Sequence, residues 1–574
     1  MTQTYFVEWS RPHRNGHPCR HAALLGRTGL KERWRGSRGT LFATDDLPLR
    51  MLSGRSGVVV GPLFDRLGHS APSVLPNRNE HFDSAAFVRD RWGSYIAFVE
   101  TNERLSVLRD PSGGLPCYRT SQGEHHYVTS APHLLFECGI LAPMLDWTMI
   151  AEALARHDQR RGSTCLTGVS ELPPGNLLEL SQGASAESEV WNARKIAAGG
   201  GLEGSPEQLE HALTSSLGAW GTLAARPVIE ISGGLDSAIV AAGVAGSSPG
   251  ATLLTFAPSP GDADETGYAQ AVADHLGLPL QVVCPDVADV DLTLSLSARL
   301  PRPNARAFTQ AGDALSLAYA RSVGADAFFS GGGGDDVFCY LRSVLPAIDR
   351  WRCEGLRAMA ITALDVARTN HATLWEVFHR LVQRAMAPRV SGERLDTRFM
   401  SVDCSAALPA PAAPADAVGL LPGKARHVDG IATIHNYLEG HGRASFAPIV
   451  SPLLSQPIVE ACLAIPTWRW CEHGRNRAAA RAAFETKLPR VILDRRSKGS
   501  FDGFCARLLD RNRDLIWDML SDGRLVSQGL LDLPAISSAL HHPSPPAGSV
   551  SRLLAIVDVE SWVRAWTRPQ HQLG

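Results

Sequence analysis

The chain has 574 residues, of which 44% are hydrophobic and 20% are charged, and its formal net charge is -2. This composition is typical of a globular protein and excludes a wholly disordered chain, and the near-neutral charge gives no global attraction to nucleic acid or to membranes. No apolar run of about 18 residues is present and the N-terminus has no apolar signal core, so we expect neither a transmembrane helix nor a secretory signal. The 11 cysteines are scattered and odd in number, as expected of reduced thiols in the cytoplasm.

Short apolar runs separated by turn residues predict strands in the first third of the chain. They lie at 57–61, 94–100 and 105–108. The glycine-rich stretch 197–206 is typical of a flexible linker. We therefore expect one domain over 1–196 and a second over 205–574.

Beyond this stretch, strand and helix patterns alternate, which predicts a parallel sheet. The predicted strands are 227–231, 251–256 and 280–284, and the predicted helices are 238–245 and 268–276.

The segment SGGLDS follows the first of these strands and precedes the first helix. Its two glycines allow close backbone approach, and a turn of this kind presents backbone N–H groups at a helix N-terminus, where an anion binds. Asp236 would repel bare phosphate but is a suitable ligand for Mg²⁺ bound to phosphate. The alternative is a glycine-rich turn in which the aspartate only caps the helix. The residues predicted to bind a nucleotide here are Ser232, Gly233, Gly234, Asp236 and Ser237.

A second glycine cluster, SGGGGDD at 330–336, follows another predicted strand at 325–329. It would lie at the carboxyl edge of the parallel sheet, where open α/β sheets bind ligands. Alone, such a turn is more often a flexible loop, but beside SGGLDS it becomes the second half of a Mg–ATP site. The residues predicted to serve that site are Gly331, Gly332, Asp335 and Asp336.

These motifs resemble the asparagine synthetase superfamily over nearly the whole chain. SGGLDS resembles the family's pyrophosphate loop, SGGGGDD stands where the family has SGxGxDE, and 481–503 resembles a C-terminal segment in which a lysine contacts pyrophosphate. That lysine matches Lys498, which by itself would be taken for a solvated residue. The resemblance implies a doubly wound parallel α/β ATP-pyrophosphatase domain with a helical extension over 205–574.

The N-terminal part resembles the family's glutaminase domain in its segments 105–118 and 168–180. This implies a degenerate N-terminal-nucleophile αββα sandwich over 1–196, so that the chain combines α/β and α+β architecture.

Glutaminase activity is not expected. Thr2 stands where the family has its catalytic cysteine, the first cysteine is Cys19, and Val60 and Gly61 stand where the family has the Asn-Gly of its oxyanion hole. Thr2 could in principle act as an N-terminal nucleophile, but loss of an oxyanion-hole donor alone costs about 10²–10³ in rate.

The acceptor region also departs from the family. Gly332 stands where asparagine synthetases have glutamate and the β-lactam-forming branch has tyrosine, and 448–455 reads PIVSPLLS in place of ExRxPFLD. We therefore expect an ATP-dependent carboxylate activator with a more open and less charged acceptor site.

This combination most resembles lasso peptide macrolactam synthetases, whose second loop is commonly SGGGGD, a polar residue and then VF; here 330–340 reads SGGGGDDVFCY. The resemblance implies that Mg–ATP adenylates an Asp or Glu side chain of a precursor peptide. The N-terminal α-amine of the peptide would then attack, releasing AMP and closing an isopeptide-bonded ring. A leader peptidase and a leader-recognition protein are the partners implied, and neither nucleic acid nor a membrane is expected.

Each site residue has an expected role. Asp236 and Asp335 are the expected Mg²⁺ ligands, and Lys498 is expected to stabilise charge at the phosphate or on the tetrahedral intermediate. Asp336 is the candidate proton acceptor in the amide-forming step. A peptide α-amine has a pKa near about 7.7–8.0, so a substantial fraction is already neutral near pH 7.

The enzyme alternatives are an ammonia-dependent asparagine or amide synthetase and a β-lactam-type synthetase. Gly332 and the lost acidic acceptor site argue against both. A non-catalytic peptide-binding scaffold is the alternative from another class, and the intact SGGLDS loop, Asp335 and Lys498 argue against it.

Overall fold

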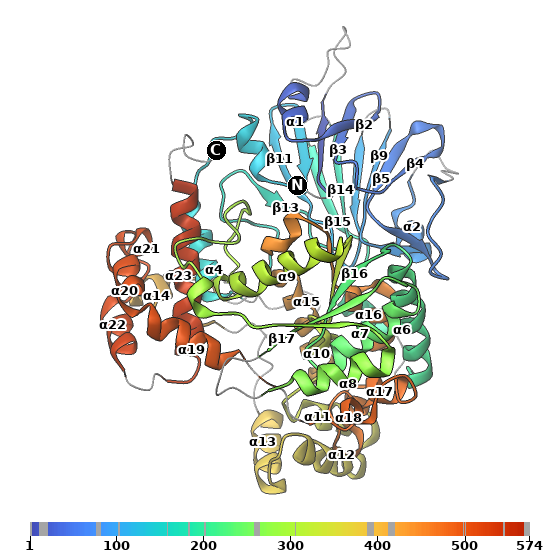
Figure 1. Ribbon diagram of the computed structural model, residues 1–574, viewed down its shortest axis with the longest axis vertical. Helices are drawn as coiled ribbons and strands as arrows, with labels where there is room; N and C mark the ends of the chain where they lie inside the picture. Colours follow the sequence, from blue (N-terminus) through green and yellow to red (C-terminus); the bar gives the residue numbers. More distant parts are fainter. Residues whose placement is uncertain are drawn as a thin grey trace.

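The computed structural model is drawn in Figure 1. It describes residues 3–10, 21–75, 82–101, 104–157, 159–181, 184–199, 203–257, 264–304, 306–386, 395–410, 419–496, 499, 501–542 and 546–567. An almost wholly antiparallel sandwich forms the first part of the chain, and a parallel sheet flanked by helices forms the second. No helix in the described part of the chain is long and apolar enough to cross a membrane.

Two sheets make the sandwich. The six-stranded sheet has the order β13 (Ser170–Glu171), β11 (Tyr118–Gln122), β12 (His125–Thr129), β1 (Tyr5–Trp9), β3 (Gly39–Ala43), β2 (Lys31–Arg35). The seven-stranded sheet has the order β15 (Ala184–Glu189), β14 (Asn176–Ser181), β10 (Leu105–Arg109), β9 (Ile96–Glu100), β5 (Gly57–Val60), β4 (Leu49–Leu52), β7 (Val74–Leu75). A short ribbon of β6 (Leu63–Asp65) and β8 (Arg91–Gly93) adjoins them. The three strands predicted in this part are confirmed as β5, β9 and β10.

Alternating side chains of β1 explain the layers. Tyr5 and Val7 pack into the core between the sheets, whereas Phe6 packs on the opposite face, as a strand period of two requires. That outer face is covered by α1 (Ala22–Arg27), α3 (His133–Glu137) and α4 (Trp147–Ala155), and α2 (Ser84–Asp90) covers the other sheet. The predicted αββα arrangement is confirmed.

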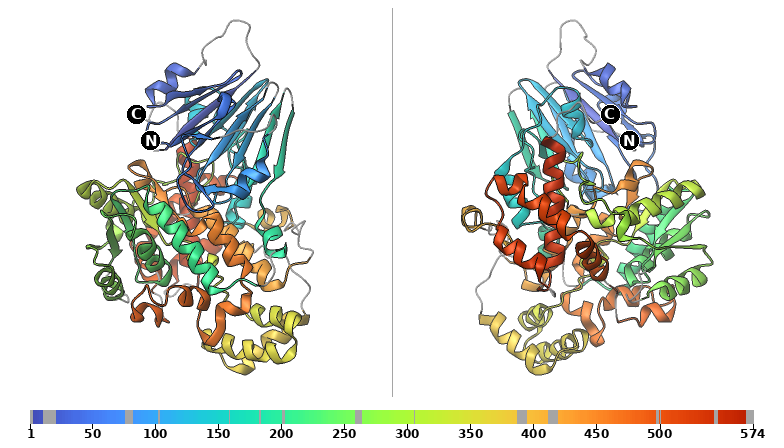
Figure 2. Two further views of the ribbon diagram at one scale, coloured as in Figure 1. Left: turned by 90° about the vertical axis from the view of Figure 1, so that its right-hand side faces the viewer. Right: turned by 60° about the vertical axis from the view of Figure 1, so that its left-hand side comes forward.

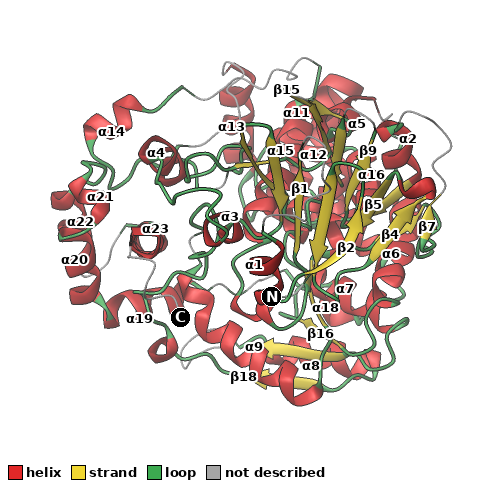
Figure 3. Cartoon of the chain, turned by 90° about the horizontal axis from the view of Figure 1, so that it is seen from above, coloured by secondary structure: helices red, strands yellow, loops and turns green. Residues whose placement is uncertain are grey.

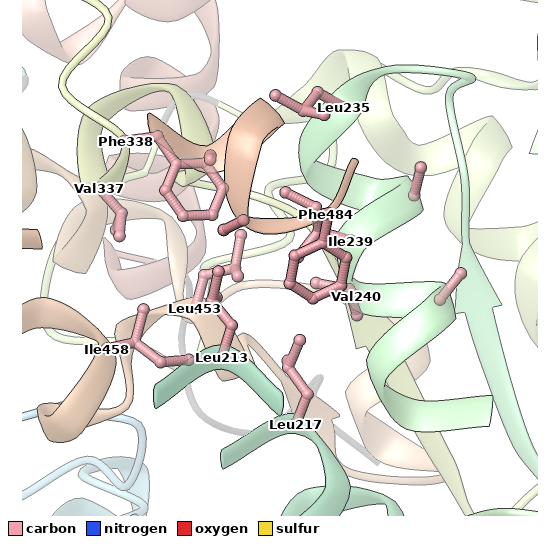
Figure 4. Packing of buried hydrophobic residues seen from close by; sticks show 14 of the residues in the cluster. Leu213, Leu217, Leu235, Ile239, Val240, Val337, Phe338, Leu453, Ile458 and Phe484 are labelled. Carbon is pink, nitrogen blue, oxygen red and sulfur yellow. The ribbon is translucent and has the colours of Figure 1, made fainter. Parts of the chain in front are cut away.

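The second part is built on a five-stranded parallel sheet. Its order is β18 (Leu280–Val283), β17 (Thr252–Phe256), β16 (Pro227–Glu230), β19 (Ala327–Ser330), β20 (Ile449–Val450). Ile229 packs with α6 (Pro206–Gly221) and α7 (Leu235–Ala245) on one face, and Val228 packs with α9 (Gln310–Val323) on the other. Figure 4 shows the first of these cores. Helices on both faces confirm the doubly wound fold, and α8 (Thr266–Leu276) confirms the second predicted helix.

Helical segments complete the second part. Those that flank the sheet or the sandwich are α5 (Ala193–Gly199), α10 (Gly334–Val337), α15 (Pro422–Ile434), α16 (Gln456–Ala464), α17 (Ala478–Ala483) and α18 (Arg490–Leu493). A projecting group at the lower end of Figure 2 contains α11 (Leu345–Glu354), α12 (Leu356–Thr369) and α13 (Leu374–Met386). The remaining helices are α14 (Val402–Ala407), α19 (Asp502–Arg511), α20 (Arg513–Ser521), α21 (Arg524–Ser527), α22 (Leu533–His541) and α23 (Ser549–Thr567).

The apolar cores on the two sides of the predicted linker are continuous. One buried cluster combines Phe6 and Ile150 with Leu553 and Trp562, and the rings of Phe136 in α3 and Trp566 in α23 meet edge to face at 5.0 Å. Figure 3 shows α23 in this region. Part of the stretch predicted to be a linker is helical, because α5 extends to Gly199 and packs against α15 and α16.

A buried ion network also joins the two parts. Glu171 in β13 meets Arg109 at 2.7 Å, Arg160 at 2.7 Å and Arg302 at 2.8 Å. Arg160 also donates to the carbonyl of His435 at 2.7 Å and to the Glu439 carboxylate. Burial alone would raise the pKa of Glu171, but the three arginines outweigh it and hold the pKa well below its ordinary value.

We expect Glu171→Gln to lower the free energy of unfolding by about 3–5 kcal/mol, because three buried guanidinium groups lose their countercharge. Since the pKa of Glu171 is lower in the folded state, its stabilising contribution is present above the ordinary glutamate pKa and is lost as the pH falls below it. Urea unfolding at pH 7 and at acid pH measures both effects. Glu187→Gln is the control, because Glu187 pairs with Arg119 at the surface, and should change stability by less than about 1 kcal/mol. Equal losses in the two variants would contradict the prediction.

Candidate active site

The two glycine-rich loops lie side by side at the carboxyl edge of the parallel sheet. β16 and β19 are hydrogen-bonded neighbours in parallel register, with Glu230 opposite Ser330. The first loop leads from β16 into α7, and the second leads from β19 into α10. The structure therefore brings SGGLDS and SGGGGDD together at the sheet edge where open α/β folds bind ligands.

Glycine is required where the two loops touch. A Cβ on Gly331 would lie 2.6 Å from the Ser237 Cα, and a Cβ on Gly334 would lie 2.6 Å from the Asp236 Cγ. Gly233 has φ of 63°, and a Cβ there would collide with Tyr268. The lack of a side chain at Gly331 thus allows the two loops to touch. Gly334 has the same role, which was not predicted from the sequence.

The first loop leaves the N-terminus of α7 open to an anion. Gly234 is the N-cap of α7 and has no side chain with which to cap the helix. The Ser237 hydroxyl accepts from the Ser232 backbone N–H at 3.2 Å and donates to the Gly234 carbonyl at 3.2 Å. The predicted phosphate-binding serines therefore shape the turn, and the N-terminus of α7 provides a favourable field for phosphate.

Both predicted metal ligands point at one arginine nitrogen. Arg477 Nη1 lies 2.7 Å from Asp236 Oδ2, 2.9 Å from Asp236 Oδ1 and 2.7 Å from Asp335 Oδ1. Arg477 is 6% exposed and Asp236 is 7% exposed, so this cation lies in a largely buried position. The sequence analysis missed Arg477, because no motif near it marks a contact with residues 142 and 241 positions away.

This geometry suits a divalent cation. A cation at the Arg477 Nη1 position would meet carboxylate oxygens from both loops, which is the hard oxygen donor set that Mg²⁺ prefers. No group of three or more His, Cys, Asp or Glu side chains that could hold a metal occurs among the described residues. Mg²⁺ would therefore need phosphate oxygens beside Asp236 and Asp335.

Asp336 lies apart from these carboxylates. A Cβ on Gly430 of α15 would lie 2.6 Å from Asp336 Oδ1, so the Asp336 carboxylate packs against α15. His427 of the same helix lies with its Nε2 3.0 Å from the Val337 carbonyl. The structure therefore directs the Asp336 carboxylate toward α15, whereas Asp236 and Asp335 meet at Arg477.

A second arginine fixes the first loop. Arg495 Nη1 donates to the Gly233 carbonyl at 2.8 Å, Arg495 Nη2 pairs with Glu265, and the guanidinium lies 4.1 Å from the centre of the Tyr268 ring. The Gly499 N–H donates to the same Glu265 carboxylate. Lys498 itself lies outside the described residues, and its described neighbours Arg495 and Gly499 are anchored beside the first loop.

The region that corresponds to a glutaminase site borders a cavity of about 360 Å³, which is lined in part by Gln3, Pro62 and Ser94. A Cβ on Gly61 would collide with the Ser94 carbonyl oxygen, and Gly61 has φ of 97°. The buried guanidinium of Arg50 donates to the Ala71 carbonyl at 2.9 Å and to the Gly61 carbonyl at 3.3 Å. Thr2 and Cys19 lie outside the described residues.

We expect Arg477→Met to lower the free energy of unfolding by about 3 kcal/mol, because the Asp236 and Asp335 carboxylates lose the cation between them. In the presence of nucleotide, added Mg²⁺ should restore part of this loss, because phosphate oxygens complete the ligand set beside Asp236 and Asp335. Thermal unfolding with and without Mg²⁺ measures this. Arg475→Met is the control, because Arg475 makes a largely exposed pair with Asp494. A variant as stable as the wild type, or one insensitive to Mg²⁺, would contradict the arrangement.

Comparisons with known proteins identify the family to which the second part of the chain is similar. Residues 224–567 match the family described as asparagine synthase. A search of curated proteins finds no significant match. Among solved structures, the allosteric regulatory enzyme of purine biosynthesis is 10% identical, over 50% of this chain and 82% of its own, with a TM-score of 0.22. The glutamine phosphoribosylpyrophosphate amidotransferase from B. subtilis, complexed with ADP and GMP, is 11% identical, over 51% of this chain and 77% of its own, with a TM-score of 0.20. Similarities to solved structures at this level carry no information about function.

The family match over 224–567 covers more than half of the chain and includes both glycine-rich loops. The chain therefore belongs to the asparagine synthase family, whose chemistry is ATP-dependent amide bond formation.

Proposed function

We propose that the chain is a lasso peptide macrolactam synthetase. It activates an Asp or Glu side chain of a precursor peptide with ATP and joins it to the peptide's N-terminal amine, releasing AMP and pyrophosphate. The observation that carries this proposal is the space at Gly332. Gly332 is exposed, and among the described residues a Cβ there would have only the Ser330 hydroxyl within 4 Å, at 3.3 Å. The second loop therefore leaves room for a bulky acceptor where the family places a large side chain.

The residues of the two loops suit the activation step. The α7 N-terminus and the Ser232 and Ser237 hydroxyls would bind the phosphates, and Asp236 and Asp335 would hold Mg²⁺. Mg²⁺ supplies charge stabilisation for the departing pyrophosphate when it is bound. Lys498 is proposed to add positive charge at the α-phosphate. The loops also hold the carboxylate and the amine in one place, which can contribute several kcal/mol by proximity.

The proposal carries consequences for partners and for location. The α-amine must first be freed, so a leader peptidase must act before this enzyme, and a leader-recognition protein would deliver the precursor. We place the reaction in the cytoplasm. We also propose that the sandwich does not hydrolyse glutamine, because Val60 replaces an oxyanion-hole asparagine and Arg50 is bonded to neighbouring carbonyls.

The direct test uses a precursor core peptide with a free N-terminal amine and Mg–ATP. Mass spectrometry should show the loss of one water from the peptide, with one AMP released for each ring. Glutamine in place of the peptide should release no glutamate. AMP release with a small amino acid and ammonia, but with no peptide, would replace the proposal with an amide synthetase.

We expect Asp236→Asn and Asp335→Asn each to lower AMP release and cyclisation by at least about 100-fold, because each variant removes one of two carboxylates for Mg²⁺. Asp236→Asn should also reduce stability, since Asp236 is buried against Arg477, whereas the more exposed Asp335 should tolerate the change. AMP assays and thermal unfolding separate the two effects. Asp274→Asn on the outer surface of α8 is the control. Near-normal AMP release by both variants would remove the metal assignment.

We expect Gly332→Glu to leave ATP binding within about threefold of wild type but to block cyclisation, because the side chain fills the acceptor space and adds an unpaired carboxylate. Fluorescent ATP titration and mass spectrometry measure the two effects. Gly246→Glu is the matched control, since Gly246 lies at the far end of α7 with no atom within 4 Å of its Cβ position. Normal cyclisation by Gly332→Glu would refute the open-acceptor argument.

A further inference from the structure

A buried charged cluster lies at the end of β16, directly before the first loop. Arg443 Nη2 donates to Glu230 Oε2 at 2.8 Å, and Arg443 Nη1 pairs with Asp313 of α9. The Gly442 N–H donates to Asp313 at 2.7 Å. Arg443 belongs to the turn Gly442–Ser445, so three separate elements contribute to the cluster. The acceptor edge of the sheet therefore carries more charge than the sequence PIVSPLLS predicts.

The register between β16 and β19 places Glu230 near Gly332, the position that lacks a side chain. Val228 and Phe328 are paired residues and pack in the same core on the α9 face. Glu230 and Ser330 are paired two residues further along the same strands. Because side chains alternate along a strand, those of Glu230 and Ser330 lie on the α9 face as well. The Ser330 hydroxyl accepts from the Gly332 N–H at 3.1 Å. Glu230 thus comes from the neighbouring strand to the same corner of the sheet as Gly332.

One oxygen of Glu230 is available for a proton. Oε1 is buried and forms no well-aligned hydrogen bond within the described residues, although the Ser316 hydroxyl of α9 lies beside the Glu230 carboxylate, and Oε2 is held by Arg443. Burial raises the pKa of Glu230, and Arg443 opposes this only in part. A carboxylate with a fixed orientation and a raised pKa suits general base catalysis near neutral pH.

The other groups around Glu230 do not compete for this role. Arg306 is a cation that lies within 3.4 Å of His441 Nδ1, and Asp313 is bonded to Arg443 and to Gly442. The pKa of His441 is well below its ordinary value, because of burial and of the two nearby arginines, so it is neutral at pH 7.

We propose that Glu230 is the proton acceptor of the amide-forming step and takes over the role of the side chain that is missing at Gly332. This inference rests on the proposed function. In the step, the lone pair of the α-amine nitrogen forms the C–N bond to the carbonyl carbon of the acyl adenylate. The C–O bond to AMP breaks, AMP leaves with that electron pair, and the proton lost by the nitrogen goes to Glu230 Oε1.

The test separates the two half-reactions in Glu230→Gln. Cyclisation of the core peptide should fall by at least about 100-fold, the usual size of a general base contribution. Hydroxylamine, a weakly basic nucleophile that is neutral at pH 7, should still trap the activated carboxylate as a hydroxamate. The rate of hydroxamate formation and the affinity for a fluorescent ATP analogue should stay within about threefold of wild type, because Glu230 does not contact Asp236 or Asp335, the proposed metal ligands.

Two further variants separate catalysis from structure. Glu230→Asp keeps a carboxylate and should cyclise the peptide at least about tenfold faster than Glu230→Gln. If Glu230→Gln does not fold, the ratio of cyclisation to hydroxamate formation in Glu230→Asp provides the test instead. Asp313→Asn leaves Glu230 with Arg443 alone and should lower cyclisation more than hydroxamate formation, but by less than Glu230→Gln does.

Three results would overturn the inference. The first is cyclisation by Glu230→Gln within about threefold of wild type. The second is a parallel loss of hydroxamate and ring, which would assign Glu230 to structural support alone. The third is the absence of AMP and hydroxamate from the wild type with any core peptide, which would overturn the proposed function and this inference with it.

Discussion

The close contact between the two glycine-rich loops is the constraint on which the rest of the site depends. Gly331 and Gly334 meet the backbone and side chain of the first loop at distances that no Cβ would allow. This contact brings Asp236 and Asp335 to one point, where their mutual repulsion requires a cation. Arg477 supplies that cation in the structure. The glycines therefore determine the electrostatics of the site as well as its shape.

The N-terminal sandwich supports this site through α15. Arg160 donates to the carbonyl of His435, at the C-terminal end of α15, and Glu171 holds Arg160 in place. The same helix packs on the second loop, where Gly430 lies against Asp336. The sandwich thus contributes to the position of the second loop. Because the apolar cores are also continuous, removing the sandwich would expose buried surface on α23.

The sequence predicts much of the fold because its local signals are strong. The strands of the parallel sheet and the helices after them lie within about three residues of their predicted bounds, since turn glycines and apolar runs mark them clearly. The same signals predict both loops. They cannot predict Arg477 or Arg495, whose partners are more than 140 residues away and whose local sequence resembles a solvated basic segment. The helix α5 within the predicted linker depends likewise on packing against α15 and α16, which no local pattern records.

Glu230 illustrates how a parallel sheet can move a function from one strand to another. Paired residues of adjacent parallel strands present their side chains on one face, so a group lost after β19 can be replaced by a group at the end of β16. The replacement needs support, because a carboxylate in that position is largely desolvated. Arg443 and Asp313 provide it from two further elements, and together they orient one oxygen of Glu230 while leaving the other available. The acceptor site can then be open at Gly332 and still have a carboxylate nearby. The open space follows β19, whereas the Glu230 carboxylate comes from the end of β16.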